Sequence, residues 1–464
     1  MVTMVNRCLG KAVAAARLLR HPGKADRVRL VAIGHLLSGN FLSAALMLVS
    51  IAIAARVLEP ERYGIMVMVL SFSRLVERVL RFESWQALIR FAAQEEQESN
   101  PERQSRLYAY GLLLDAGAAA LAAFTSVALA LVGQAIVGIE PQHVELVAIY
   151  AAALLLNLGG VPTAALRLAG RFRLLAYAQL VANVLRILLA ALCAWAGAGL
   201  LGFMVAWTVA QICGSLIIFA LGMRALASSR IPSPFKAGIR GLHRDFPGFL
   251  SFACSTNLSL TLRVITTEAD SLFVGTVAGA PAAAIYHLAK RIAKVAMQVA
   301  AQVQAVIYPD VARMWARGNV AGFRRATLNV QVALGVLGVL MLAAAAIIAP
   351  FILRIGPGES YMSTYPLLLA QLVAVILTLY AAPSRSALLA MNDSWHVLKV
   401  SLVGTTIFTV IALLTVPRFG AIGANIAHVA LGACIAVALE VRLLARLREH
   451  QAGAQHPTVE PLRS

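Results

Sequence analysis

The chain has 464 residues, of which 60% are hydrophobic and only 13% are charged, with a mean hydropathy of +0.79. Soluble globular domains carry about 25% charged residues, so this composition argues against a water-soluble enzyme. The charged residues are 40 Lys and Arg against 21 Asp and Glu, and they are not gathered into a polar domain of the kind that binds nucleic acid.

Twelve long apolar runs follow a basic segment at 1–28. In chain order they cover about 30–55, 63–89, 107–133, 146–166, 174–196, 200–222, 247–277, 282–309, 327–353, 362–390, 396–417 and 421–441. Each run is long enough to cross a bilayer as a helix and lacks the strict alternation of membrane β-strands. The sequence therefore predicts an all-α polytopic membrane protein with about 12 transmembrane helices.

The basic residues between these runs predict the orientation. The N-terminal segment, every second loop and the C-terminal tail lie on one side of the membrane. Together they contain 28 Lys and Arg. The opposite loops hold only Arg56, Arg62, Arg354 and Arg418. Because Lys and Arg concentrate in cytoplasmic loops, both termini are expected in the cytoplasm of a multi-pass protein of the inner membrane.

Landmark residues recur at a fixed offset and indicate a duplicated six-helix unit. Pro60 and Pro281 open spans 2 and 8, and Pro162 and Pro383 lie in spans 4 and 10, each pair 221 residues apart. Two parallel six-helix repeats would place a substrate site at their shared interface. The expected domains are a basic N-terminal segment (1–28), an N-lobe (29–223), a cytoplasmic linker (224–246), a C-lobe (247–445) and a cytoplasmic tail (446–464).

Thirteen charged residues lie at least six residues from either end of the predicted spans. The basic ones are Arg74, Arg78, Arg81, Arg186, Arg263, Lys290, Arg291 and Lys294, and the acidic ones are Glu77, Glu83, Asp115, Glu268 and Asp270. Facing lipid, they would together cost roughly 30–45 kcal/mol, so they are expected to pair, to reach the membrane surface or to line water.

In span 2, the spacing of these charges indicates a shared face of three arginines and one ion pair. Arg74, Arg78 and Arg81 recur at i, i+4 and i+7 and therefore share one helix face. Glu77 precedes Arg81 by four residues, the favourable order for an ion pair, so this pair is interpreted as structural.

Span 8 carries a similar polar stripe. Lys290, Lys294 and Gln298 recur every four residues. Cations exceed acids by three inside the membrane, and structural pairing does not require such an excess. We therefore expect Arg74, Arg78, Lys290 and Lys294 to line a cavity for an anionic substrate. Ion pairs that only stabilise helix contacts are the open alternative.

Short motifs resemble the Wzx-type polysaccharide flippases of the MOP superfamily. Residues 57–64, VLEPERYG, are similar to the family's LGPEEFG turn between spans 1 and 2. In the second half, Asp270, Gly275, Gly279 and Tyr286 follow the family's pattern of an aspartate, two glycines and a tyrosine. One departure is Ala284, which stands where the family usually has glycine.

This resemblance implies two six-helix, MATE-like lobes in a V around a central cavity that opens alternately to the two sides. The implied substrate is an undecaprenyl-pyrophosphate-linked oligosaccharide for O-antigen, capsule or exopolysaccharide synthesis. Membrane lipids, a polysaccharide polymerase and a chain-length regulator are the implied partners. In that cavity the expected phosphate contacts are Arg74, Arg78, Lys290 and Lys294, with Arg263 and Arg186 as further substrate contacts.

Other polar residues receive secondary roles in the same scheme. Gln298 is expected to contact sugar. Asp115, Glu268 and Asp270 are candidates for a proton or cation step, although Asp270 also occupies a motif position that suits a structural pair.

Two other functions stay open. A MATE-type multidrug or cation antiporter shares the architecture, but it favours an acidic cavity and often a carboxylate in span 1, and 30–55 contain no Asp or Glu. A membrane polysaccharide polymerase or ligase needs a large outer loop with acid/base residues, and the predicted outer loops are short. No metal-binding spacing, catalytic motif or cofactor motif occurs, so a non-enzymatic protein without metal or cofactor is expected.

Overall fold

The computed structural model describes residues 24–81, 84–98, 100–132 and 138–455. Side chains are not described in the helical segments 24–41, 93–94, 96–98, 255–267, 299–312 and 451–455. Most of the predicted basic segment at 1–28 and the end of the predicted tail, together with Glu83, lie outside the described residues.

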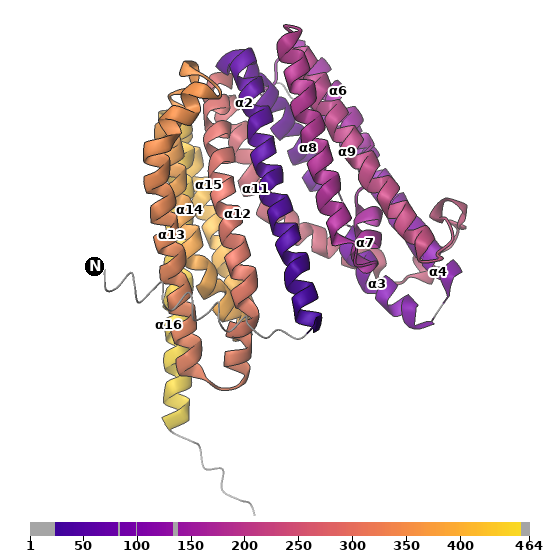
Figure 1. The fold of residues 1–464 in the computed structure, drawn as a ribbon, viewed down its shortest axis with the longest axis vertical. Helices are drawn as coiled ribbons and strands as arrows, with labels where there is room; N and C mark the ends of the chain where they lie inside the picture. Colours follow the sequence, from indigo (N-terminus) through magenta and orange to yellow (C-terminus); the bar gives the residue numbers. More distant parts are fainter. Residues whose placement is uncertain (1–23, 82–83, 99, 133–137, 456–464) are drawn as a thin grey trace, which may run out of the picture.

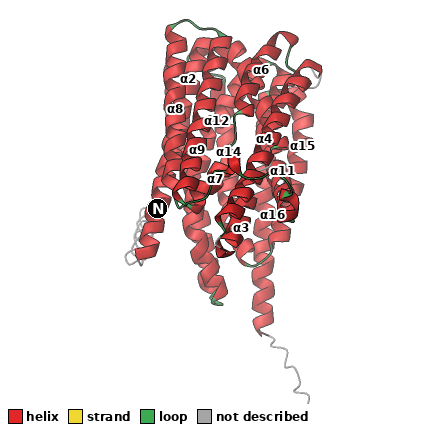
Figure 2. Ribbon diagram, turned by 90° about the vertical axis from the view of Figure 1, so that its right-hand side faces the viewer, coloured by secondary structure: helices red, strands yellow, loops and turns green. Residues whose placement is uncertain are grey.

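The described part of the chain is helical, without a β-strand (Figure 2), and forms two groups of helices (Figure 1). The first group contains α2 (Lys24–Leu80), α3 (Ser84–Glu98), α4 (Pro101–Val132), η1 (Pro141–His143), α6 (Val144–Leu155), α7 (Gly160–Leu168), α8 (Phe172–Trp195) and α9 (Leu200–Ser228). The second contains α11 (Phe249–Ala278), α12 (Ala280–Ala316), α13 (Val320–Ile355), η3 (Glu359–Tyr361), α14 (Thr364–Ala390), α15 (Ser394–Phe419) and α16 (Ala421–Gln455).

The two groups meet where α11 and α12 pack against α2. The beginning of α2 and the end of α16 lie at the same end of the molecule (Figure 1), here called the terminal end. An even number of membrane crossings requires this arrangement.

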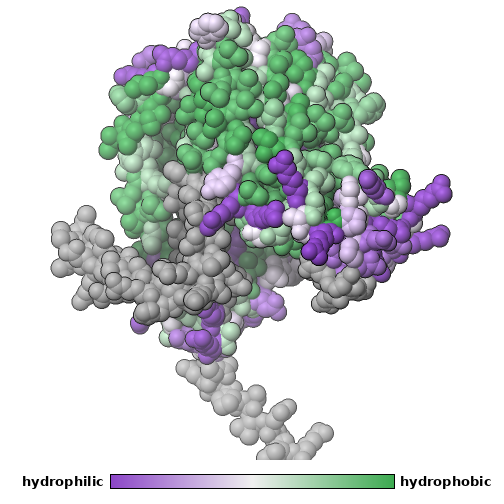
Figure 3. All heavy atoms as spheres, turned by 45° about the vertical axis from the view of Figure 1, so that its right-hand side comes forward, coloured by the Kyte–Doolittle hydropathy of each residue, from purple (hydrophilic) through white to green (hydrophobic). Residues whose placement is uncertain are grey.

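A wide apolar surface covers the upper part of the face shown in Figure 3. Large hydrophobic side chains such as Phe124, Trp195 and Ile347 are 74%, 86% and 80% exposed. Such a belt would be unstable in water and matches a lipid-facing surface. In the same view, hydrophilic residues lie at the top and over the lower half of the molecule. The protein is therefore a polytopic membrane protein.

Nine helical stretches of the described residues are long and apolar enough to cross a membrane. One of them, Leu42–Ala92, runs through a sharp kink in α2 and so contains two crossings. The helices α11 and α12, with 30 and 37 residues, are also long enough to cross but contain undescribed side chains. With these, the helices correspond to the twelve predicted spans.

The kink in α2 lies at Glu59, whose φ of 58° and ψ of 171° are not helical. Pro60 follows and lacks the amide hydrogen that would continue the helix. Met47 and Arg74 lie on opposite sides of this kink along the chain yet line one cavity, so the chain turns back on itself here. Gly279 adopts a similar φ of 88° and ψ of 165° just before α12. The two halves of the chain thus enter spans 2 and 8 through similar backbone turns.

Two predicted spans are not continuous. The run at 63–89 is divided between α2, which ends at Leu80, and α3, which begins at Ser84. The run at 146–166 is divided between α6, which ends at Leu155, and α7, which begins at Gly160. Broken helices in membranes occur where other protein groups satisfy the freed backbone atoms, and Asp115 does so here, as described below.

The predicted linker is mostly exposed but is anchored to the first group of helices by a few contacts. It contains η2 (Pro234–Lys236) and α10 (Leu242–Asp245). Arg106 of α4 forms an ion pair with Asp245 at 2.5 Å and donates to the carbonyl oxygen of Arg240 at 2.7 Å. Leu242 and Phe246 are 3% and 1% exposed within the apolar core of the first group.

The helices close tightly at the end opposite the termini. Gly64 of α2 lies so close to the backbone of Ala280 that a side chain at position 64 would overlap it. The last carbonyl oxygens of a helix have no partner within the helix. One of them, that of Ile355 at the end of α13, accepts a hydrogen bond from Arg56 at 2.5 Å. Tyr63 packs edge-on against Tyr361 with ring centroids 6.2 Å apart. Both tyrosines are fully buried, so the two groups of helices are in contact at this end.

Candidate functional site

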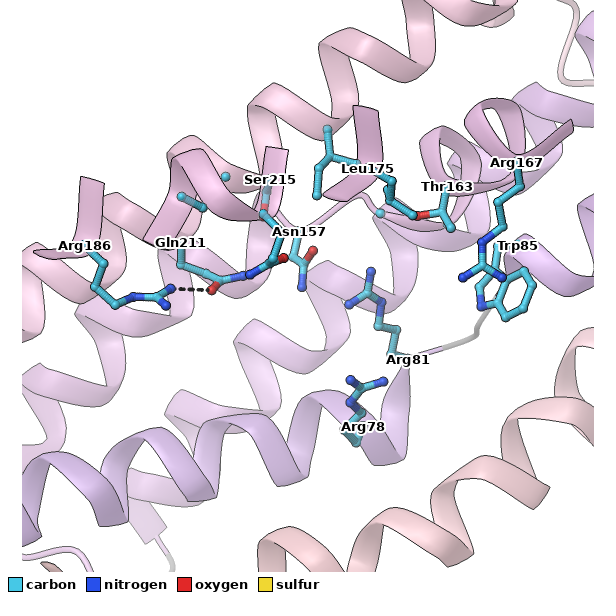
Figure 4. Close-up of a pocket in the computed structure, with 16 residues that line it drawn as sticks. Arg78, Arg81, Trp85, Asn157, Thr163, Arg167, Leu175, Arg186, Gln211 and Ser215 are labelled. Atoms are coloured by element: carbon cyan, nitrogen blue, oxygen red, sulfur yellow. Dashed lines mark hydrogen bonds between the residues drawn. The ribbon is translucent and has the colours of Figure 1, made fainter. Parts of the chain in front are cut away.

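Two adjoining cavities lie between the helices and share Gln179, Arg186 and Gln211. Cavity A, of about 370 Å³, is drawn in Figure 4 and is lined by residues of α2, α3, α7, α8 and α9 and of the gap between α6 and α7. Cavity B, of about 420 Å³, lies between α2, α8 and α12. Cavity A contains Arg78, Arg81, Arg167 and Arg186, and cavity B contains Arg74, Arg186, Arg291 and Lys294. No Asp or Glu occurs among the described residues that line either cavity.

Arg186 of α8 connects the two cavities. Its side chain is 4% exposed and donates to the amide oxygens of Asn183 at 2.9 Å and Gln211 at 3.3 Å. Its guanidinium carbon lies 5.6 Å from the Trp207 ring centroid, and its buried Nε has no hydrogen-bond partner in the described structure. A buried guanidinium held by neutral groups, with one donor unused, is suited to binding an anion.

The charge of Arg81 in cavity A is balanced by a neighbouring carboxylate. Arg81 and Glu77 form an ion pair at 2.9 Å, and Asn157 also donates to Glu77 at 2.6 Å. These contacts join the end of α2 to the gap between α6 and α7, so the pair holds the broken spans together. Arg78, on the same helix end, lines the cavity beside Arg81 (Figure 4).

Arg167 and Trp85 lie at the far end of cavity A from Arg186 (Figure 4). The guanidinium of Arg167 lies over the Trp85 ring, 4.0 Å from its centroid, in a cation–π contact. The stack holds the guanidinium in one orientation. Arg167 directly follows the predicted span at 146–166, so the sequence did not indicate its place in the cavity.

The α12 side of cavity B carries Arg291, Lys294 and Gln298. Arg291 Nε donates to His287 Nε2 at 3.0 Å, and His287 Nδ1 lies 3.0 Å from the Tyr63 hydroxyl. Because Nε2 accepts from Arg291, His287 is neutral with its proton on Nδ1, from which it donates to Tyr63. The amide oxygen of Gln298 is buried and has no partner in the described structure.

Glu268 and Arg74 lie close to this group. Glu268 on α11 interacts electrostatically with Lys290, Arg74, Arg291 and Lys294. Arg74 hydrogen-bonds to the Tyr150 hydroxyl and interacts with the charge of Glu268. Glu268 is thus the carboxylate that partly offsets the positive charge of cavity B, although it is not among the residues that line it.

Lys290 is not among the described residues that line the two cavities. Instead of lining either cavity, its ammonium pairs with Asp270 of α11 at 2.5 Å. Asp270 also accepts from Tyr286 at 2.7 Å and pairs with His428 of α16 at 2.8 Å. The carboxylate is 1% exposed, so Lys290 supplies charge that a buried anion requires. Spacing along one helix could not reveal this partner on another.

The carboxylate of Asp115 contacts the starts of α3 and α7. Its carboxylate accepts from Ser84 Oγ at 2.6 Å and from the Val161 amide at 3.1 Å. It therefore caps the positive end of α7 and fixes the start of α3 beside it. A Cβ on Gly160 would lie 2.5 Å from both Asp115 oxygens, so glycine is needed for this approach.

The structure thus brings Arg74, Arg78, Arg186, Lys294 and Gln298 together around two connected cavities. It places Lys290 and Asp270 in a separate buried cluster. The side chain of Arg263 lies outside the described residues. Sequence reasoning did not single out Asn157, Gln179, Gln211 or His428. A polar residue in an otherwise apolar span was the available signal for each.

Comparisons with known proteins agree with this architecture. Residues 53–366 match the family model described as "Polysaccharide biosynthesis protein". The inner membrane protein YghQ of Escherichia coli (strain K12) is 26% identical over 307 residues, which cover 65% of this chain and 86% of that protein.

Solved structures show the same fold at low sequence identity. A lipid II flippase, MurJ, in an inward closed conformation matches with a TM-score of 0.67 and 14% identity, covering 90% of each chain. An inward-facing multidrug resistance MATE family transporter of the MOP superfamily matches with a TM-score of 0.64 and 16% identity, covering 90% of this chain and 96% of that one. The solved structures confirm the predicted fold, and the chain belongs to the polysaccharide biosynthesis protein family.

Proposed function

We propose that this protein is a flippase that moves an undecaprenyl-pyrophosphate-linked oligosaccharide across the inner membrane for surface polysaccharide synthesis. The observation that carries the proposal is Arg186, a buried guanidinium with an unused donor that joins two cavities lined by arginine and lysine. A diphosphate needs such groups to leave water, because its negative charge is costly in a low-dielectric cavity.

In this proposal the lobes at 29–223 and 247–445 open alternately to the two sides of the membrane. The tight contacts of Gly64 and Arg56 close one side in the present conformation. With both termini in the cytoplasm, the closed side is the periplasmic one. The diphosphate would bind first at cavity B, where Arg74, Arg186 and Lys294 converge.

We assign energy coupling to the cluster around Asp270. This carboxylate joins α11, α12 and α16 through Lys290 and His428, so a change in these ion pairs would alter contacts between three helices. Asp115 is less suited to this role, because its two oxygens already fix the start of α7 and the Ser84 hydroxyl.

The charge of the cavities favours this function over multidrug antiport. Cationic drugs require acidic groups at the binding site, and the described lining of both cavities contains only basic and neutral residues. Family membership also points to polysaccharide synthesis. A membrane polymerase or ligase would require reacting groups outside the membrane, where the described connections are short.

The test is complementation of polysaccharide export in a strain that lacks the gene. Arg186→Ala is expected to reduce surface polymer at least about tenfold, since a lost charge-assisted contact costs about 1.5–3 kcal/mol. Arg173→Ala, an exposed arginine outside both cavities, is the matched control and is expected to export normally. Normal polymer in an Arg186→Ala strain with wild-type protein levels would contradict the proposal.

A further inference from the structure

The predicted linker at 224–246 leaves two large apolar side chains uncovered. Phe235 and Ile239 are 68% and 63% exposed, whereas Leu242 of the same segment is 3% exposed. The segment does not extend away from the protein, because η2 and α10 both pack against α4. Isolated apolar side chains are common on protein surfaces, so their position relative to the membrane decides what covers them.

Phe235 lies at the edge of the lipid-facing surface. Its ring centroid is 6.1 Å from that of Phe219 on α9. Phe219 is three residues inside the predicted end of the span at 200–222, which is about 4–5 Å along the helix. Leu216, three residues earlier on the same helix face, is 49% exposed and belongs to the lipid-facing surface. The linker therefore passes the outside of α9 where the hydrocarbon layer meets the lipid headgroups.

Each of the two apolar side chains is followed by a basic one. Lys236 and Arg240 are both exposed, and neither forms an ion pair in the described structure. The segment 229–246 contains one acidic residue, Asp245, which is already paired with Arg106 of α4 at 2.5 Å. An apolar side chain beside a cation is suited to the membrane surface, because the apolar group enters the acyl chains while the cation meets lipid phosphates.

We propose that the linker binds anionic phospholipid at the membrane surface of the terminal end. Phe235 and Ile239 enter the upper part of the acyl chains, and Lys236 and Arg240 contact the phosphate groups. A phospholipid with a net negative charge, such as phosphatidylglycerol, is favoured over a zwitterionic one because the exposed charge of the linker is positive. This contact ties the first group of helices to one leaflet and involves neither cavity.

The experiment measures which lipids lie beside the linker in the full-length protein in nanodiscs. Gly238→Cys, in a background with the five native cysteines replaced, carries a bimane label, since a Cβ there would meet nothing within 4 Å. The probes are phosphatidylglycerol and phosphatidylcholine with a nitroxide near the top of one acyl chain, each added as a small fraction to phosphatidylcholine. Quenching is expected to give phosphatidylglycerol an association constant at least about fivefold higher, the effect of one basic residue at an anionic surface.

Three variants assign this preference to the named residues. Lys236→Gln combined with Arg240→Gln is expected to bring the ratio of the two association constants toward one. The matched control, Arg317→Gln combined with Arg324→Gln, removes the same charge from two exposed arginines near the start of α13 and is expected to keep the wild-type ratio. Phe235→Ser is expected to weaken quenching by both lipids, because the label is then held less deeply. If a variant fails to fold, the wild-type ratio decides by itself.

Three outcomes would overturn the inference. Equal wild-type quenching by the two lipids would show apolar contact without recognition of the anionic headgroup. An unchanged ratio in the variant without Lys236 and Arg240 would show that these cations do not provide the contact. Absence of quenching by either lipid, together with quenching by aqueous iodide, would show that the linker faces water and is available to an acidic protein instead. Because no cargo is used, none of these results bears on the flippase proposal.

Discussion

The contact between Gly64 and the start of α12 offers a direct way to shift the conformation with one methyl group. A Cβ at position 64 would lie 2.9 Å from the Cα of Ala280 and closer still to its carbonyl group, whereas ordinary contacts are 3.4–4 Å. The neighbouring atoms are backbone and cannot rotate away. Overpacking of this kind costs about 1–3 kcal/mol. We expect α2 and α12 to separate when the cavity opens on the side opposite the termini. Gly64→Ala then lowers the stability of the present conformation by about 1–3 kcal/mol and leaves the other conformation unchanged.

An energy difference of this size would change the ratio of the two conformations roughly 5- to 150-fold. The assay uses a single cysteine at Gln211, which lines both cavities, in a background with the five native cysteines replaced. Gly64→Ala is expected to increase its labelling by a membrane-impermeant maleimide added on the side opposite the termini.

The matched control is Gly117→Ala, because a Cβ there would meet nothing within 4 Å. It is expected to label as the parent does. If Gly64→Ala and Gly117→Ala label at the same rate from both sides while both proteins remain folded, the contact at Gly64 does not close the cavity and the reasoning is refuted.

Two further predictions concern stability. Gly160→Ala is expected to destabilise the purified protein by about 1–3 kcal/mol through overlap with Asp115 and Ser84, measured as a lower thermal midpoint than that of Gly117→Ala. Equal midpoints would contradict the assigned packing of α7. Asp270→Ala is expected to cost about 3–5 kcal/mol because it leaves Lys290 without its carboxylate, and the added Lys290→Met change is expected to recover part of that loss. A double variant no more stable than Asp270→Ala would show that the pair is not coupled.

Local patterns in the sequence predicted much of the fold. Apolar run length predicted the helices because each span must satisfy its own backbone in lipid. Pro60 and Pro281 marked the backbone turns that begin spans 2 and 8. The spacing of Glu77 and Arg81 predicted the ion pair that the structure contains.

Contacts between distant segments were not predictable in the same way. The division of the run at 146–166 depends on Asp115 of another helix, which caps α7. Likewise, Lys290 could not be separated from Lys294 by spacing, and only the position of Asp270 on α11 explains why one is paired and the other lines cavity B. A helical stripe identifies which residues share a face but not which neighbour that face meets.

The central claim is that the cationic cavities carry a lipid-linked oligosaccharide across the membrane. The most direct measurement is flipping of a fluorescent undecaprenyl-pyrophosphate oligosaccharide in proteoliposomes, followed by protection of its sugar from an added glycosidase. The account predicts protein-dependent movement between leaflets in the wild type and its loss in Arg186→Ala. Equal rates in vesicles with and without the protein, under a proton or sodium gradient of either direction, would contradict it.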